Sequence, residues 1–307
     1  MKVCSSLRIM SALLPGVLFC LSMLRGQSQS EIYSQYGTIR KVSLKSAPFP
    51  HPRRAQGYTY RDQLFAAEQH YQDSSVAIFI PNYFRPGKRV DFVVHFHGWN
   101  ASIDSVLKRF RLIEQLSGSR KNAILIVPQG PKNAPDSFGG KLEDPDGFKS
   151  FMEEIVLYLR AEQLLGKSRI GNIILSGHSG GYHVIASILN CGGLTGNIKE
   201  VHLYDGLYGE IEKYVQWIEH YNGKFIHIFT TNGGTKENSI ALMDSMKCWQ
   251  MPFCYTMEDE LSQAMLMDNR IIFIFSNLRH SEVISVKDEY ERFLSASQYL
   301  KTVRMRE

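Results

Sequence analysis

A serine among glycines, at the end of an apolar run, is the feature of this sequence most suited to chemistry. The stretch I-L-S-G-H-S-G-G-Y-H, residues 174–183, contains the pattern G-x-S-x-G around Ser179. In a sharp turn between a strand and a helix, the hydroxyl of such a serine is exposed and can attack a carbonyl carbon. The same residues could merely cap a helix, so the other groups that a nucleophilic serine needs must be found elsewhere.

A nucleophilic serine needs a base, and histidine is the side chain that most often takes its proton. Of the 10 histidines, His280 follows the last predicted strand and precedes the last predicted helix, in S-N-L-R-H-S-E. His202 and His227 lie inside predicted strands and are expected in the core. His178 adjoins the serine, but a neighbour at such a turn points elsewhere. The sequence therefore favours His280 as the base.

An acid must hold the imidazole of the base in the right tautomer. Asp205 ends the predicted strand 200–205 and opens the turn D-G-L-Y-G. It could orient His280, or it could be a turn aspartate that caps the following helix. The chain order Ser179, Asp205, His280 is one in which such triads occur.

Two backbone donors would complete an acyl-transfer site, because negative charge develops on the carbonyl oxygen during the reaction. Gly180 offers one N–H group as the first residue of the helix after the serine. Trp99, in F-H-G-W-N at 96–100, offers the other, and Gly98 lets the backbone approach. The sequence therefore predicts an oxyanion hole built from Gly180, Trp99 and Gly98.

The sequence predicts no metal site. The pattern His95-x-His97 has no Asp-His or Cys partners at ligand spacing, and no cysteine pairs of the zinc type occur. We expect one of these histidines to be a core residue and the other to orient the loop at 96–100 by hydrogen bonding.

The elements that must position these residues alternate between strands and helices. Eight strands are predicted, at 58–61, 76–81, 90–97, 122–128, 172–176, 200–205, 224–230 and 270–276. Continuous apolar strands between amphipathic helices indicate an α/β protein with a mostly parallel sheet and helices on both faces. The connection from 76–81 to 90–97 is too short for a crossover, so we expect this pair, and hence the second strand, to be antiparallel.

The helical segments are less regular than the strands. Apolar residues spaced at helical intervals between Phe148 and Leu159 predict one buried helical stripe. Further helices are expected at 102–116, 180–190, 211–220 and 282–299, and the segment 236–268 is expected to be mainly helical. The Gly- and Pro-rich loop 129–147 and the segment 236–268 should flank the site. Aromatic residues there could line a substrate groove or only pack a lid: Trp99, Phe138, Trp249, Phe253 and Tyr255.

From about Gly57 to its end the chain resembles the α/β-hydrolase-fold superfamily. Strand order, antiparallel second strand, G-x-S-x-G turn, H-G loop and late histidine carry the resemblance. It implies a serine hydrolase with a Ser-His-Asp triad, an acyl-enzyme intermediate and neither metal nor organic cofactor. A carboxylic ester is the expected substrate, small or borne on a polymer. A peptidase or amidase of the same fold, or a binding protein that has lost catalysis, are the alternatives.

The acid departs from the pattern usual in this superfamily, in which it follows the next strand. Here that position is T-T-N-G-G-T, residues 230–235, which offers only Asn232 before Glu237. Some members of the superfamily place the acid one strand earlier, as Asp205 would be. Glu237 therefore remains the alternative acid.

The first 30 residues are expected to be a secretion signal peptide, with Lys2 and Arg8 before an apolar run from 9 to 24. Pro15 interrupts this run, which argues against a membrane anchor. Phe19 is too bulky for lipoprotein processing at Cys20, so simple export, to a secreted or periplasmic location, is the favoured interpretation. Residues 31–56 are expected to form an arm or linker, and residues 57–307 the catalytic domain.

The net charge limits the classes of binding partner, and the cysteines indicate which disulfide is possible. The formal net charge is +5, and three of the positive charges lie in the predicted signal peptide. The remaining +2 is too small to indicate binding of nucleic acid or of an anionic membrane. In an oxidising compartment Cys248 and Cys254 could form a disulfide, which would leave Cys191 buried and unpaired.

Overall fold

The computed structural model describes residues 29–304 of the 307-residue chain. All but the last two residues of the predicted signal peptide, Cys20 among them, lie outside this range. Within the described range, no helix is long and apolar enough to cross a membrane.

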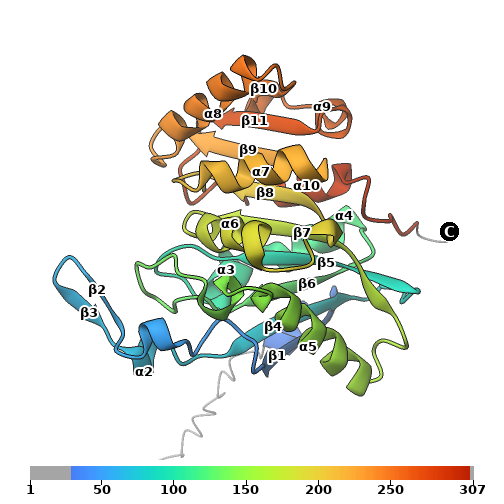
Figure 1. Ribbon diagram of the computed structural model, residues 1–307. Coiled ribbons are helices and arrows are strands. Elements are labelled where there is room, and N and C mark those ends of the chain that lie inside the picture. The colour runs from blue at the N-terminus through green and yellow to red at the C-terminus, as the bar shows by residue number, and fades with distance from the viewer. Residues whose placement is uncertain (1–28, 305–307) are drawn as a thin grey trace, which may run out of the picture.

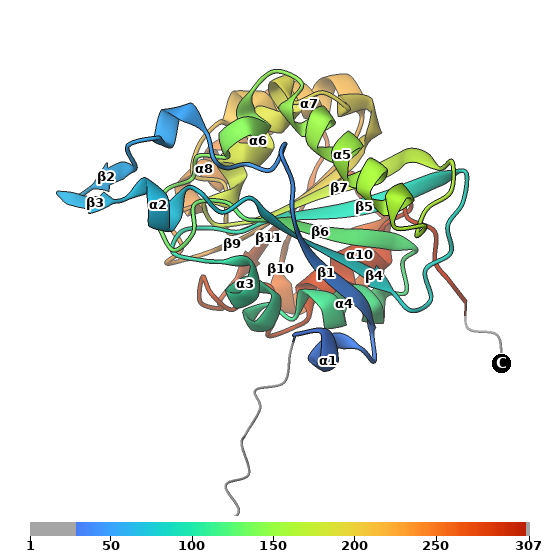
Figure 2. The same ribbon diagram turned by 90° about the horizontal axis from the view of Figure 1, so that it is seen from below.

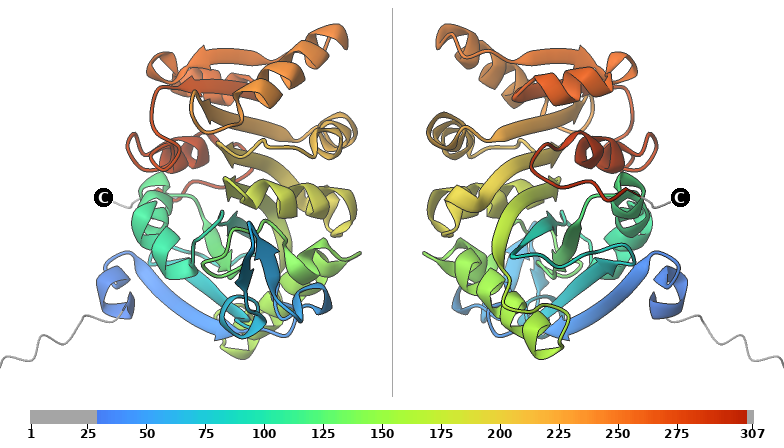
Figure 3. Two further views of the ribbon diagram at one scale, coloured as in Figure 1. Left: turned by 90° about the vertical axis from the view of Figure 1, so that its left-hand side faces the viewer. Right: turned by 90° about the vertical axis from the view of Figure 1, so that its right-hand side faces the viewer.

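A nine-stranded sheet forms the centre of the described chain (Figure 1), in the spatial order β1-β4-β6-β5-β7-β8-β9-β11-β10. Strand β4 is antiparallel to both of its neighbours, and the strands from β6 to β10 are parallel to one another. The predicted mostly parallel sheet with an antiparallel second strand is therefore confirmed. Figure 3 shows its continuous twist from one edge to the other. The strands are β1 Gly37–Ser43, β4 Ser75–Pro81, β5 Arg89–Phe96, β6 Ala123–Pro128, β7 Arg169–His178, β8 Ile198–Tyr204, β9 Lys224–Thr230, β10 Cys254–Met257 and β11 Ile271–Ser276.

The sheet has nine strands where the sequence predicts eight, because both of its edges differ from the prediction. Strand β1 comes from the segment 31–56, expected as an arm or linker; the charged Arg40, which is half-buried, and the exposed Lys41 obscure its apolar pattern. Strand β10 is only four residues long and lies inside the segment expected to be helical. The predicted strand 58–61 is outside this sheet: β2 (Tyr58–Tyr60) and β3 (Gln63–Phe65) form a separate hairpin.

Strands β4 and β5 run in opposite directions, as predicted, but they do not pair with each other. Strand β6 lies between them and pairs with both. All six residues of β6 are buried, and a strand that is apolar on both faces is stable only inside a sheet. The order of the strands in space therefore differs here from their order in the chain.

Helices cover both faces of the sheet, as Figure 2 shows. One face carries α5 (Gly147–Ala161), α6 (Gly181–Cys191), α7 (Ile211–Tyr221) and α8 (Lys236–Cys248), and the other carries α3 (Ile103–Arg109), α4 (Leu112–Ser119), α9 (Gln263–Asp268) and α10 (Glu289–Ala296). The predicted helix 102–116 is interrupted at Arg111, whose φ is +50°. The final helix is shorter than predicted because residues 281–288 form turns. Of two short helices, α1 (Gln29–Tyr33) precedes β1 and α2 (Ala67–His70) lies between β3 and β4 in the chain.

Helix α5 confirms the predicted buried stripe. Its six predicted apolar residues are all at most 5% exposed: Phe148, Phe151, Met152, Ile155, Val156 and Leu159. Burying a side chain of this kind contributes roughly 1.5–3 kcal/mol to stability. The stripe therefore fixes α5 on the same face of the sheet as α6, the helix that follows Ser179.

The segment 44–74, between β1 and β4, projects from the sheet, and the β2–β3 hairpin forms its tip (Figure 1). A small apolar cluster of Phe49, Tyr71, Ala134 and Phe138 anchors it to the loop 129–147. Arg54 also forms a bidentate ion pair with Asp136. Its Nε lies 2.7 Å from Oδ2 and its Nη2 lies 3.1 Å from Oδ1, and both side chains are largely buried. This anchor fixes the position of Ser137, which lies in the candidate site.

Candidate active site

Ser179 occupies a sharp turn between β7, which ends at His178, and α6, which begins at Gly181. Its φ is +52°, a left-handed conformation that costs a residue other than glycine of the order of 1–3 kcal/mol. A Cβ atom on Gly181 would lie 2.5 Å from the carbonyl oxygen of Phe96, and one on Gly177 would lie 2.6 Å from Ile185. The glycines of the motif therefore let strand and helix pack closely enough to hold the serine in this strained position.

Asp205 and His280 come together at the carboxyl edge of the sheet, as predicted. Nδ1 of His280 lies 2.7 Å from Oδ2 of Asp205. Because an ionised carboxylate can only accept, Nδ1 carries the proton and Nε2 is left free to act as a base. The alternative acid, Glu237, is exposed in the first turn of α8 and makes no contact with His280 in the described chain. The geometry therefore favours Asp205 over Glu237.

The carboxylate of Asp205 is fully buried, and three residues donate hydrogen bonds to it. Besides His280, the hydroxyl of Thr230 donates at 2.8 Å and the hydroxyl of Thr235 donates to Oδ1. Burial would raise the pKa of Asp205, but the hydrogen bonds from His280, Thr235 and Thr230 outweigh it and lower the pKa to about 2. Asp205 is therefore ionised throughout the neutral range and can stabilise a positive charge on His280.

The loop 230–235 gives Asp205 its surroundings, and sequence analysis missed this role. Where the superfamily pattern would place an acid, the loop supplies the hydroxyls of Thr230 and Thr235. Gly233 lies directly against the Asp205 carboxylate, and a Cβ atom there would collide with it. The two threonines that bound T-T-N-G-G-T, in the loop next to the chosen acid, were the available signal.

His280 and Ser179 lie on neighbouring loops, but no hydrogen bond joins them in the described chain. Such contacts are often long before substrate binds and tighten in the reacting complex. Tyr208 lies close to both residues: its ring centre is 6.4 Å from that of His280, and it lines the same cavity as Ser179. Burial and the nearby Asp205 charge raise the pKa of Tyr208 to about 12, so its hydroxyl stays neutral and can donate.

The predicted oxyanion donors lie against the serine. A Cβ atom on Gly98 would lie 2.6 Å from Cβ of Ser179 and 3.2 Å from the backbone nitrogen of Gly180. Within the described residues, neither the N–H of Gly180 nor that of Trp99 donates a backbone hydrogen bond. Two free N–H groups beside a nucleophile are the donors that an oxyanion would need.

His97 fixes the loop that carries Trp99. Its Nε2 accepts from the N–H of Gly130 at 2.9 Å, so its Nδ1 carries the proton and donates to the carbonyl of Gly98 at 2.8 Å. His95 is fully buried and contacts Ser176 at 2.8 Å. The expectation of one core histidine and one loop-orienting histidine is confirmed.

A cavity of about 220 Å³ lies over the serine, lined by Trp99, Ser137, Ser179, Gly180, Tyr182 and Tyr208. The indole Nε1 of Trp99 donates to the hydroxyl of Ser137 at 2.7 Å, and the ring of Tyr60 packs edge-on against Trp99 at 5.2 Å. The hairpin and the loop 129–147 therefore fix the orientation of the Trp99 ring.

Trp99 is the one member of the predicted aromatic set that lines this cavity. Phe138 lies in the small cluster beneath the hairpin. Phe253 and Tyr255 line a separate groove of about 400 Å³ against α8, and Trp249 follows the end of that helix. Of the two alternatives for the aromatic residues of the segment 236–268, lining the cavity over Ser179 therefore does not hold, because α8 directs this segment toward the far edge of the sheet.

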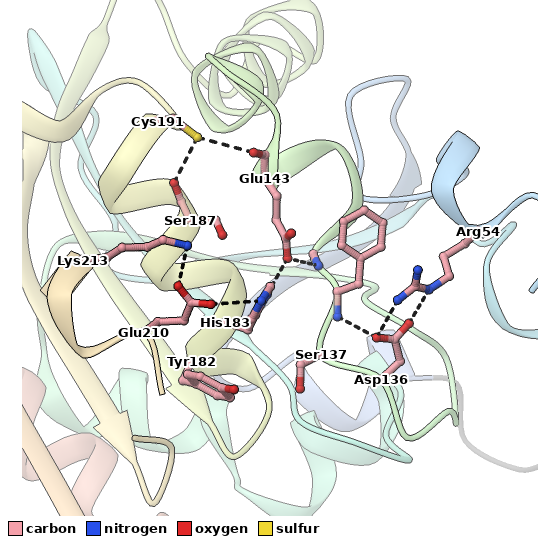
Figure 4. Close-up of polar contacts among 12 residues, drawn as sticks. Arg54, Asp136, Ser137, Glu143, Tyr182, His183, Ser187, Cys191, Glu210 and Lys213 are labelled. Atoms are coloured by element: carbon pink, nitrogen blue, oxygen red, sulfur yellow. Dashed lines mark hydrogen bonds and ion pairs between the residues drawn. The ribbon is translucent and has the colours of Figure 1, made fainter. Parts of the chain in front are cut away.

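A second histidine network lies beside the cavity, on α6 (Figure 4). Nδ1 of His183 is 2.8 Å from Glu143, and its Nε2 is 3.5 Å from Glu210, which also pairs with Lys213. The hydrogen bond with Glu143 raises the pKa of His183, although burial opposes the rise. The network ties the loop 129–147 and the start of α7 to the helix that follows Ser179.

The described residues contain neither a disulfide nor a cluster of side chains suited to a metal ion. Cys191, Cys248 and Cys254 are all free thiols, so the disulfide that Cys248 and Cys254 could form is not present. Cys191 is partly exposed rather than buried, and its Sγ lies 3.5 Å from the carbonyls of Glu143 and Ser187 (Figure 4). Between residues 29 and 304, no group of three or more His, Cys, Asp or Glu side chains could hold a metal ion.

Comparison with solved structures shows the fold. A mutant of the feruloyl esterase module from Clostridium thermocellum, complexed with sinapinate, superposes with a TM-score of 0.53 and 10% identity, covering 89% of this chain and 92% of that one. The substrate-bound fluorophosphonate-binding serine hydrolase F of Staphylococcus aureus gives 0.50 and 10%, covering 86% and 100%. A ferulic acid esterase gives 0.51 and 13%, covering 74% and 92%. No known family's sequence profile and no curated protein matches the chain. The chain therefore has the α/β-hydrolase fold.

Proposed function

We propose that this protein is a serine hydrolase that cleaves a carboxylic ester through Ser179, His280 and Asp205. The observation that carries the proposal is the Asp205–His280 hydrogen bond beside a serine in strained left-handed backbone, at the edge of the sheet where this fold places its ligands. The solved structures of the same fold include esterases and a serine hydrolase, which supports the same class of reaction.

The reaction follows from the roles of these groups. Oγ of Ser179 attacks the ester carbonyl while Nε2 of His280 takes its proton, and the N–H groups of Gly180 and Trp99 stabilise the oxyanion. The protonated His280, stabilised by Asp205, then gives the proton to the leaving alcohol. Water, activated by the same histidine, attacks the acyl group on the serine and releases the acid.

The cavity supports an acyl group of moderate size, preferably one with a ring. Its volume of about 220 Å³ is too small for a long alkyl chain, and three of its six lining residues are aromatic. The Clostridium thermocellum neighbour is described as a feruloyl esterase complexed with sinapinate, an aromatic acid. We therefore propose aromatic acyl esters as the first substrates to test, acted on outside the cytoplasm if residues 1–30 direct export.

A substrate panel tests the proposal. It contains aromatic acyl esters, straight-chain acyl esters of graded length, acetylated sugars and peptides, each with the wild-type protein and the S179A variant. We expect turnover of aromatic and short acyl esters by wild type and none above background by S179A. Faster cleavage of peptides than of esters would favour the amidase alternative. Failure of wild type to react with a fluorophosphonate at Ser179 would favour the binding-protein alternative.

A further inference from the structure

His178 takes no part in the chemistry above, yet it contacts the proposed base. It is the last residue of β7, directly before Ser179, and is 7% exposed. Its Nε2 lies 2.8 Å from the backbone carbonyl oxygen of His280. Since a carbonyl oxygen can only accept a hydrogen bond, Nε2 carries the proton and donates it.

We propose that His178 is a positioning residue that holds the backbone of His280, so that one strand end fixes both the nucleophile and the base. This inference rests on the proposed function, because it assigns a role toward the base of that same site. The residue that looked like a base beside the serine instead acts through the base on the neighbouring loop.

The loop that carries His280 needs such a support. His280 lies in a turn after β11, outside the sheet hydrogen bonding. The backbone N–H groups of Leu278 and Arg279 donate hydrogen bonds to the side chains of Ser276 and Glu282, which belong to the same segment of the chain. His178, in contrast, belongs to β7, which pairs along its length with both β5 and β8. The hydrogen bond from His178 therefore connects the loop to the rigid centre of the sheet.

The ring of His178 is itself held on both sides. Its centre lies 4.8 Å from that of Phe110 and 4.5 Å from that of His280. Burial lowers the pKa of His178 to about 3, with the neighbouring His280 charge adding to the effect. His178 thus stays neutral while His280 gains and loses its proton, and its donor remains available throughout the reaction.

Three substitutions separate the hydrogen bond from the packing. Gln can place its Nε2 donor near the position of the imidazole Nε2, Leu fills similar space without a donor, and Asn has a donor that is too short to reach. We expect H178L and H178N to lower kcat about 10–100-fold, because a misplacement of about 1 Å can cost this much, with KM nearly unchanged. H178Q should restore most of kcat. The free energy of unfolding of each variant is measured in urea, and H178N replaces H178L if H178L does not fold.

A readout that packing alone would not move is the Nδ1 proton resonance of His280. We expect it to persist in H178Q and to broaden or disappear in H178N and H178L. Full kcat in a folded H178N or H178L, or equal losses in H178Q and H178N at matched stability, would overturn the inference. Reaction of wild type with a fluorophosphonate at Ser179 is measured first, because its absence contradicts the proposed function, while the resonance still tests the role of His178.

Discussion

Strand β8 carries a carboxylate near each end, and each carboxylate pairs with a histidine. Near its start, Glu200 lies 2.8 Å from Nε2 of His202, and just beyond its end Asp205 lies 2.7 Å from Nδ1 of His280. The distances are nearly equal, and both carboxylates are fully buried. A carboxylate–histidine pair alone therefore does not identify a catalytic site in this molecule.

The two pairs differ in access and in the partners of their remaining atoms. The His202 side chain is fully buried, and among residues 29–304 neither Nδ1 of His202 nor Oε1 of Glu200 has a hydrogen-bond partner. The His280 side chain is 32% exposed, and the second oxygen of Asp205 accepts from Thr235. The pair near the start of β8 lies in the core, whereas the pair beyond its end is partly exposed near Ser179, the proposed nucleophile. Substitutions at these carboxylate–histidine pairs test this difference.

The largest effect is expected at the carboxyl end of β8. D205N removes the charge that orients and stabilises protonated His280, so kcat should fall about 10⁴-fold, or roughly 5.5 kcal/mol of transition-state stabilisation. Steady-state kinetics on the best ester of the panel measures it. E237Q is the matched control at the alternative acid and should leave kcat unchanged; a large loss in E237Q with a small one in D205N would reverse the assignment.

Near the start of β8, the expected change is in stability. E200A leaves Nε2 of the buried His202 without its hydrogen-bond partner and should lower the free energy of unfolding by about 1–3 kcal/mol. Urea denaturation measures this change. Activity per folded molecule should equal that of wild type, and a loss of kcat in folded E200A comparable to that of D205N would remove the distinction between the two pairs.

The threonine donors of Asp205 are expected to have an intermediate effect. T235V removes one hydrogen bond to a charged oxygen, a contribution of about 1.5–3 kcal/mol, and should raise the pKa of Asp205 from its value of about 2. We expect kcat to fall about 10-fold, with the acid limb of the pH–rate profile moved to higher pH. S239A is the control variant, because it removes a buried hydroxyl that contacts His227 and not Asp205. An unchanged pH–rate profile in T235V would argue against a role for the Thr235 hydroxyl.

The smallest effect is expected at His183, a third carboxylate–histidine pair. Its pKa is raised in the folded protein, mainly by Glu143, so protonation favours folding. The added stability is complete below the unfolded pKa of about 6.5 and is lost as the pH rises through the folded pKa. We expect wild type to exceed H183Q in unfolding free energy by up to about 1 kcal/mol near pH 5.5, and the gap to shrink above neutral pH. A difference in unfolding free energy between wild type and H183Q that increases with pH would contradict the raised pKa of His183.

The comparison also shows what sequence could and could not predict. Position relative to strand ends separated Asp205 from Glu200 and His280 from His202, because parallel strands bring their carboxyl ends to one edge. The strand count failed at the two edges, where β1 is half-exposed and charged and β10 has four residues. The partners of Asp205 were not predicted: the two threonines that bound T-T-N-G-G-T were the one signal in the sequence, and hydroxyl contacts such as those of Thr230 and Thr235 leave no periodic pattern.

The roles of His178 and the β2–β3 hairpin were also outside the reach of sequence analysis. The contact from His178 to His280 joins residues 102 positions apart, and the contact from Tyr60 to Trp99 depends on how a whole inserted segment folds. Each contact joins a strand residue, His178 or Tyr60, to a loop residue far away in the chain, and neither composition nor periodicity constrains such a pairing.

The most direct test of the account is covalent labelling with a fluorophosphonate, followed by mass spectrometry of the modified peptide. Wild type, D205N and the folded E200A variant are compared at one pH. We predict a single label on Ser179, formed at similar rates in wild type and E200A and about 10³-fold or more slowly in D205N. Absence of label, a label on another residue, or equal rates in D205N and wild type would contradict a triad of Ser179, His280 and Asp205.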